Sequence, residues 1–421
     1  MKAIQFLPSK FLNRRASSLR SSLFLLALAV SAASAFGQTL TTLYSFGAVP
    51  GDGVAPGSGV VADKNGNLFG TTGVGGVQGS DGIVFELSPP QNTGDAWVET
   101  ILHRFRGTPD GKISESRLLM TSKGALIGTT LKGGTNDLGT TYQLNPPAAQ
   151  AAWSEKILYN FGSFPGDIVT PMLGFLSAPE GLYGADQGGA NNTGAIYLLT
   201  RTSGSSTWTQ NILYSFKPTG QGDASSPSGE LIRDSAGNLY GVTTLGGANN
   251  LGAIYEVSPP AVPGNPWTET VLYSFNGTDG TLPGGRLLIG SSGQLFGTTD
   301  GGGTHQSGTV FQLTPPATPG NPWTLTTLYN FTGGNDGGFA STGVISDKKG
   351  RLFGAASNAI FMLTPPTTPG NPWTETVLHD FTGPDGFIAT TPLLLLNGAL
   401  YGTTQQGGAF GTGTVFQLTL Q

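Results

Sequence analysis

Four sequence signatures recur in the same order seven times through residues 39–421, and this repetition constrains the fold more than any other feature. Each repeat contains a Leu-aromatic-x-Phe segment, a Leu-x-Gly segment, an aromatic-centred segment often followed by Pro-Pro, and a segment that a tryptophan opens in six repeats. Successive Leu-x-Gly segments lie 58, 56, 57, 56, 57 and 48 residues apart, and they end at Gly70, Gly128, Gly184, Gly241, Gly297, Gly354 and Gly402. The segments are rich in β-forming residues and are separated by Gly, Pro, Asn and Asp, so each repeat predicts four short strands.

Four strands per repeat are typical of a propeller blade. A β-solenoid has a much shorter period, and the 67 Gly and 28 Pro residues disfavour helical repeats. A pair of β-sandwiches predicts no seven-fold recurrence. We therefore predict an all-β, seven-bladed β-propeller with four strands per blade.

The two ends of the repeat region complement each other. Residues 39–46 copy the strand that tryptophan opens elsewhere, whereas residues 414–420 end just before that strand would follow. We expect the N-terminal strand to close the last blade and so to remove two exposed sheet edges. The sixth repeat, between Leu352 and Phe361, lacks seven residues including the Gly-Gly loop, and this predicts a notch on one face.

Residues 1–35 differ from the rest and predict a secretory signal peptide. Five basic residues precede the apolar run from Leu23 to Val30, and Ala33-Ser34-Ala35 forms a small-residue cleavage site. That apolar run is shorter than the roughly 20 residues of a spanning helix, so we expect no membrane span. We divide the chain into a signal peptide, residues 1–35, and a propeller domain, residues 36–421, and we expect a secreted or periplasmic protein.

Composition limits the partners of the exported chain. The first 35 residues hold five of the 20 Lys and Arg and none of the 25 Asp and Glu, which leaves a net charge of −10. Because phosphate binding needs a basic stripe, nucleic acid is excluded as a partner. The chain has no cysteine, so its stability in an oxidising compartment depends on packing. We expect a monomer.

One ionisable residue recurs in every repeat, 15 or 16 residues before the Leu of Leu-x-Gly. These residues are Asp52, Asp110, Asp167, Asp223, Asp279, Asp336 and Asp385. Five of them precede a glycine, and Asp-Gly favours tight turns in which the carboxylate accepts hydrogen bonds from nearby backbone N–H groups. The alternative is a binding role, in which seven carboxylates ring one mouth of the central channel and attract cations such as calcium, or sugar hydroxyls. No other cofactor is expected, and the metal is left unassigned.

Other chemically capable residues are few. His305 lies in a glycine-rich loop from which it could reach a ligand, while His103 and His379 occupy an aromatic slot and are interpreted as structural. The chain has no nucleophile elbow and no His-x-x-x-His zinc spacing. The tryptophans could stack on sugars, although packing between blades is the simpler interpretation.

The repeat is similar to a known family. The run from Leu239 to Gly247, the segment from Ala253 to Pro260, Trp267, and the segment from Leu272 to Phe275 resemble the Gloeo/Verruco (GloVer) tandem repeat of exported bacterial proteins. The resemblance covers residues 39–421 and implies export, but it assigns no chemistry. The order of signatures is also kelch-like, which is an analogy of fold only.

These observations favour a secreted, non-catalytic binding or structural propeller. Its expected partner is an envelope or extracellular glycan or protein. The alternative is an extracellular polysaccharide-acting hydrolase or lyase that uses Asp residues at the channel mouth. A catalytic site would break the symmetry of the repeats, whereas these acids recur blade by blade.

Overall fold

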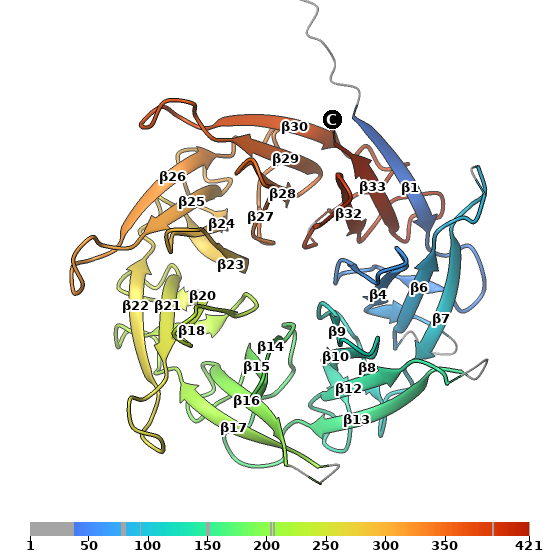
Figure 1. Ribbon diagram of the computed structural model, residues 1–421, viewed down its shortest axis with the longest axis horizontal. Coiled ribbons are helices and arrows are strands. Elements are labelled where there is room, and N and C mark those ends of the chain that lie inside the picture. The colour runs from blue at the N-terminus through green and yellow to red at the C-terminus, as the bar shows by residue number, and fades with distance from the viewer. Residues whose placement is uncertain are drawn as a thin grey trace, which may run out of the picture. The chain divides into compact units, whose positions relative to one another are not determined.

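Seven antiparallel sheets, one for each repeat, ring a common axis (Figure 1). The computed structural model describes residues 38–76, 81–92, 94–148, 152–202, 204, 207–389 and 391–420. Residues 38–421 form one compact unit, and the predicted signal peptide lies outside the described residues. No described residue is helical, and the described chain therefore offers no helix that could span a membrane. The predicted seven-bladed β-propeller is confirmed.

Each blade has four strands that follow one another from the axis outwards. The innermost strands are β3 (Val61–Ala62), β9 (Leu119–Met120), β14 (Leu176–Ala178), β18 (Ala224–Pro227) with β19 (Ile232–Arg233), β23 (Thr281–Ile289), β27 (Ile345–Ser346) and β31 (Leu394–Leu396). The second strands, which carry Leu-x-Gly, are β4 (Leu68–Thr72), β10 (Leu126–Thr130), β15 (Gly181–Asp186), β20 (Leu239–Gly246), β24 (Leu295–Gly301), β28 (Leu352–Ala356) and β32 (Ala399–Thr404).

The two outer positions are equally regular. The third strands are β6 (Ile83–Ser88), β12 (Thr140–Asn145), β16 (Ala195–Arg201), β21 (Ala253–Ser258), β25 (Thr309–Thr314), β29 (Ala359–Thr364) and β33 (Thr414–Thr419). The outermost strands are β7 (Val98–Arg104), β13 (Ser154–Asn160), β17 (Trp208–Ser215), β22 (Thr268–Ser274), β26 (Thr324–Asn330), β30 (Thr374–Asp380) and β1 (Thr39–Ser45). Two short pairs accompany the first two blades, β2 (Gly53–Val54) with β5 (Val74–Gly75) and β8 (Gly111–Lys112) with β11 (Lys132–Gly133).

The N-terminal strand closes the last blade, as predicted. β1 pairs antiparallel with β33, and Thr39 lies opposite Thr419 (Figure 1). Phe46, just after β1, is fully buried in the core cluster that the last and first blades share. The seventh sheet is therefore assembled from both ends of the chain.

The Leu-x-Gly glycines make room for an aromatic ring of the neighbouring third strand. A Cβ on Gly241 would lie 2.3 Å from the Tyr255 hydroxyl, and a Cβ on Gly70 would lie 2.6 Å from the Phe85 ring. The other five glycines face the same obstacle, since a Cβ there would lie 2.3 to 2.6 Å from Tyr142, Tyr197, Phe311, Phe361 or Phe416. The motif therefore needs glycine because a ring occupies the place of its side chain.

Aromatic contacts join each blade to the next. The Phe of each Leu-aromatic-x-Phe segment packs edge to face on the third-strand aromatic of the following blade, as Phe46 does on Phe85 with ring centroids 5.1 Å apart. Three tryptophans also reach a neighbouring blade, in the pairs Trp153 with Phe69, Trp267 with Tyr183 and Trp373 with Phe296. These three tryptophans are therefore part of the packing between blades.

The sixth blade carries the predicted notch. Ala356 at the end of β28 pairs with Ala359 at the start of β29, so only Ser357 and Asn358 form the turn. Ser357 has a φ of 54°, as tight hairpin turns require. In the fifth blade, seven residues separate β24 from β25.

Candidate functional site

The seven recurrent aspartates hold the turns that lead from one blade into the next. In the fourth blade, Asp223 Oδ2 accepts hydrogen bonds from the Tyr214 hydroxyl (2.7 Å) and the Lys217 N–H (2.8 Å), and Oδ1 accepts one from the Ala224 N–H (3.0 Å). Every repeat pairs the aspartate with the aromatic residue of Leu-aromatic-x-Phe: Asp52 with Tyr44, Asp110 with His103, Asp167 with Tyr159, Asp223 with Tyr214, Asp279 with Tyr273, Asp336 with Tyr329 and Asp385 with His379. The turn interpretation therefore agrees with the contacts of all seven carboxylates.

The aspartate turns lie beside the Gly-Gly loops, on the same face of the ring. The Asp110 carbonyl accepts a hydrogen bond from the Gly134 N–H, and the Asp223 carbonyl accepts one from the Gly247 N–H. None of the seven aspartates lines the central cavity, and Asp52, Asp167, Asp223 and Asp336 are buried. The seven aspartates therefore do not form a ring of carboxylates in the wall of this cavity. A binding role for these aspartates elsewhere stays a prediction.

His305 lies in the loop between β24 and β25. Its side chain is exposed, and Nδ1 lies 3.0 Å from the Thr304 hydroxyl oxygen. It does not line the central cavity. Ligand binding by His305 therefore also stays a prediction.

The central cavity lies where the innermost strands of all seven blades meet, and it has a volume of about 430 Å³. Apolar side chains form much of its wall, among them Leu173, Leu176, Ile232, Ile289 and Ile345. The wall also carries five charged side chains that belong to particular blades, Glu115, Arg117, Glu230, Arg233 and Arg286. An apolar pocket with a few convergent polar groups is the usual form of a ligand site.

Three of these charges occupy one position of the repeat, directly before a buried apolar residue of the inner segment. Arg117, Glu230 and Arg286 stand there in the second, fourth and fifth blades. The first, third and sixth blades have glycine at this position, namely Gly59, Gly174 and Gly343. The cavity therefore breaks the seven-fold symmetry that the aspartates keep.

Glycine leaves space for the charged side chains. A Cβ on Gly174 would lie 2.6 Å from the Glu230 carboxylate, so a larger residue there would displace Glu230. Arg117 Nη1 lies 3.9 Å from Oε2 of the same Glu230 carboxylate. Burial raises the pKa of Glu230, while the nearby Arg117 and Arg286 oppose this increase.

Two charged side chains in the cavity form no hydrogen bond or ion pair with any described residue. No described side chain forms a hydrogen bond or ion pair with the Arg286 guanidinium, and Arg286 is exposed to the cavity. Arg233 differs, because Glu180 already holds it at 3.1 Å. Glu115 is likewise unpaired among the described residues, and burial raises the pKa of its carboxyl. A guanidinium whose N–H groups are not used by the protein can bind a carboxylate or a sulfate.

Asp186 supports one wall of the cavity from behind. It replaces the threonine that the second strand carries in most repeats, and it is buried. Its carboxyl accepts hydrogen bonds from the Met172 and Leu173 N–H groups (2.8 and 3.0 Å) and from the Tyr197 hydroxyl (3.0 Å). Burial raises the pKa of Asp186 to about 7. Asp186 therefore fixes the segment that presents Met172 and Leu173 to the cavity.

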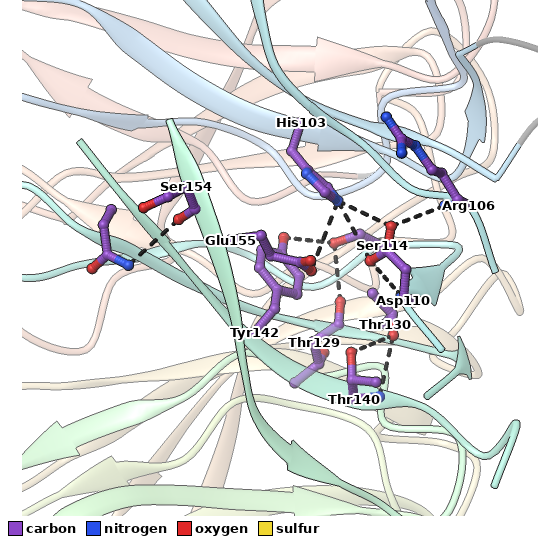
Figure 2. A network of polar contacts seen from close by, with 12 residues as sticks. His103, Arg106, Asp110, Ser114, Thr129, Thr130, Thr140, Tyr142, Ser154 and Glu155 are labelled. Carbon is purple, nitrogen blue, oxygen red and sulfur yellow. Dashed lines mark hydrogen bonds and ion pairs between the residues drawn. The ribbon is translucent and has the colours of Figure 1, made fainter. Parts of the chain in front are cut away.

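One group of side chains in the described chain has the composition and spacing of a metal site. His103, Asp110 and Glu155 each offer one ligand atom, and these atoms lie within 4.8 Å of one another (Figure 2). The group lies at the outer edge of the ring and not at the cavity. The sequence interpretation treated His103 as structural and did not include Glu155.

Fold and site together define a seven-bladed β-propeller with an asymmetrically charged central cavity. The chain belongs to the Gloeobacter/Verrucomicrobia repeat family, whose sequence model matches residues 29–197 and 79–287. No curated protein shows significant sequence similarity to the chain.

Several solved structures share the fold. PorZ, an essential surface component of the type-IX secretion system of Porphyromonas gingivalis, has a TM-score of 0.51 at 15% identity, over 88% of this chain and 47% of the PorZ chain. The extracellular domain of BT4673 from B. thetaiotaomicron has a TM-score of 0.51 at 14% identity, over 90% of this chain and 40% of that chain. The polysaccharide lyase Uly1 has a TM-score of 0.51 at 12% identity, over 93% of this chain and 94% of that chain. This chain thus spans less than half of PorZ and BT4673, and the likeness concerns the fold alone.

Proposed function

We propose that the protein is exported and acts as a non-catalytic binding propeller, whose central cavity takes an acidic sugar of an extracellular glycan. The observation that carries this proposal is the Arg286 guanidinium, which forms no hydrogen bond or ion pair with a described residue and faces a largely apolar cavity. Its family and the surface or extracellular setting of PorZ and BT4673 support export, as does the N-terminal segment. The polysaccharide lyase Uly1 supports a glycan as the ligand class.

The cavity suits an acidic sugar for two reasons. Arg286 can donate two parallel hydrogen bonds to a carboxylate or sulfate, and the partly neutralised Arg117 adds positive charge beside it. Apolar walls such as Ile232 and Ile289 can pack against the C–H faces of a sugar ring. Because the chain without its first 35 residues has a net charge of −10, a long polyanion would be repelled, and we expect a short or terminal acidic unit.

Calorimetry with oligosaccharides of glucuronic acid and with neutral glucose oligosaccharides tests the proposal. We expect residues 36–421 to bind the acidic series only, and Arg286→Ala to weaken binding by about 10- to 100-fold, as loss of a charge-assisted hydrogen bond implies. Arg286→Lys should recover only part of the affinity, because lysine lacks the planar fork. Lys123→Ala, at an exposed turn, is the control and should bind normally. Equal binding of both series, or full affinity in Arg286→Ala, would contradict the proposal.

One observation favours the enzyme alternative as a second candidate. Glu115 is an unpaired carboxyl in the cavity with a raised pKa, as a general acid or base requires. An asymmetric set of charges is also what a catalytic site would need. Incubation of the acidic oligosaccharides with the protein, followed by size analysis, separates the two functions. Unchanged chain length is expected for a binding protein, whereas shortening that Glu115→Gln abolishes would make the protein a hydrolase or lyase.

A further inference from the structure

A cluster of potential metal ligands joins the outer strands of the first two blades. His103 lies on β7 of the first blade, Glu155 lies on β13 of the second, and Asp110 lies in the turn between the blades. His103 Nε2 lies 3.3 Å from Asp110 Oδ2 and 3.7 Å from Glu155 Oε1. Figure 2 shows the three side chains pointing toward one another.

The contacts differ from those of a simple histidine–aspartate pair, for which the chain itself provides the reference. At the outer edge of the sixth blade, His379 Nε2 lies 2.7 Å from Asp385 Oδ2, the distance of a short hydrogen bond. In the cluster, His103 Nε2 lies 3.4 and 3.3 Å from the two oxygens of Asp110, too far for a strong bond to either. The His103 Nε2 atom thus lies near two carboxylates and forms a short hydrogen bond to neither.

Glu155 distinguishes the cluster from the His379 pair. Glutamate also stands at this position in other blades, as Glu99, Glu269 and Glu375, but there the neighbouring aspartate is paired with a tyrosine. Leu40 occupies its position beside the His379 pair, so that pair has no second carboxylate. Glu155 Oε1 is buried and accepts no hydrogen bond from any described residue. The same oxygen of Glu99, Glu269 and Glu375 also lacks a donor, but among the described residues this cluster alone combines such an oxygen with a histidine nitrogen and a second carboxylate.

Asp110 is held in the orientation that a ligand needs. Its two oxygens accept hydrogen bonds from the Gly111 N–H (2.6 Å) and the Arg106 N–H (3.1 Å). The Arg106 side chain lines the same surface depression as the three ligand residues, and its guanidinium forms no ion pair with Asp110 or Glu155.

The cluster is also accessible. It lies in an open depression of about 750 Å³, whose wall includes Thr108, Thr135 and Asn160. An ion could therefore enter from solvent and keep water molecules at its free coordination positions. Ligand atoms no more than 4.8 Å apart can share an ion that lies about 2.0–2.4 Å from each.

We propose that His103, Asp110 and Glu155 bind one divalent transition-metal ion of the zinc type, which joins the first and second blades. An imidazole nitrogen with two carboxylate oxygens is a ligand set that zinc accepts. Calcium prefers six to eight oxygen ligands, and this set offers too few. The site is independent of the proposed glycan cavity, which lies at the axis.

Calorimetry with zinc chloride on metal-stripped residues 36–421, with no affinity tag, tests the site. We expect one zinc ion per chain, and a loss of affinity of about 100-fold or more in His103→Tyr and in Glu155→Leu. Both substitutions introduce residues that other repeats carry, Tyr44 and Leu40 at the equivalent positions, so the blades should still fold. His379→Tyr removes the histidine of the pair without a glutamate and should bind zinc normally.

Melting temperature provides a second measurement, because an ion that joins two blades stabilises the folded ring. Zinc should raise the melting temperature of the unmodified protein and of His379→Tyr, but not that of His103→Tyr. Should Glu155→Leu fail to fold, Glu155→Gln replaces it, since Gln210 occupies this position in the third blade. The proposal is overturned if the unmodified protein binds no zinc, or if His103→Tyr or the Glu155 variant binds it with unchanged affinity.

Discussion

Removal of β1 should destabilise the whole ring, because this strand completes the last blade. Deletion of residues 36–46 removes the ladder with β33 and the buried side chains of Leu43 and Phe46. Burial of two such side chains contributes about 3–6 kcal/mol. For a domain of this size the loss lowers the melting temperature by roughly 4–8 °C. It also exposes the free edge of β33, which should promote aggregation.

The assay is thermal melting combined with light scattering on a size-exclusion column. The matched control is a circular permutant that begins at Asn321, in the connection between β25 and β26, and joins the original ends through a short linker. Such a linker is feasible because Thr39 lies opposite Thr419. The permutant keeps all seven blades complete and should melt like the original protein. A deletion variant that stays monomeric with an unchanged melting temperature would refute closure by β1 as a source of stability.

Three further predictions concern the repeat itself. Burial, reinforced by Asp223, raises the pKa of Glu269 to about 8, above its ordinary value of 4.5. The folded state therefore holds this proton more tightly than the unfolded state, and the stability of the protein falls as the pH rises from 5 to 8. The melting temperature of Glu269→Gln should fall less over this pH range than that of the unmodified protein. Gly241→Ala should push the Tyr255 ring aside and cost about 1–3 kcal/mol in urea unfolding, whereas no loss would contradict the packing role of Leu-x-Gly. The double variant Asp223→Asn, Asp279→Asn should have weaker turns and therefore a lower melting temperature. Calorimetry with calcium tests whether these aspartates also bind a cation: binding to the unmodified protein but not to the double variant would support that role.

The fold was predictable because every repeat contains the same strand-forming segments in the same order. The seven Leu-x-Gly glycines, from Gly70 to Gly402, give the number of blades, and the complementary ends of the chain identify β1 as the closing strand. The notch followed from the missing loop before Phe361. Each of these signals is local or depends on counting, so no contact between distant residues had to be guessed.

The candidate site was less predictable because it depends on contacts across blades. The recurrent aspartates suggested a ring of carboxylates, but each one accepts hydrogen bonds within its own turn and contacts an aromatic residue six to nine residues earlier. The repeat pattern does not indicate the charged residues of the cavity, because Arg117, Glu230 and Arg286 do not recur in every repeat. Alignment of the inner segments would have revealed them, since glycine occupies the same position in three other blades.

Glu155 was missed for a related reason. It lies in an outer strand whose pattern alternates exposed and buried positions, and its chemistry depends on His103 of the preceding blade. Nothing in the spacing of these two residues, which belong to different repeats, indicates that they meet. The meeting follows from the curvature of the ring, which brings successive outer strands together at the aspartate turns.

A crystal structure of residues 36–421 soaked with a glucuronic acid oligosaccharide tests the central claim most directly. We expect density for a sugar in the central cavity, with its carboxylate within hydrogen-bonding distance of the Arg286 guanidinium and its ring against Ile232 or Ile289. Arg286→Ala crystals soaked in the same way should show an empty cavity. An oligosaccharide bound at the Gly-Gly loops with the cavity free, or a sugar seated in the cavity of both proteins, would contradict it.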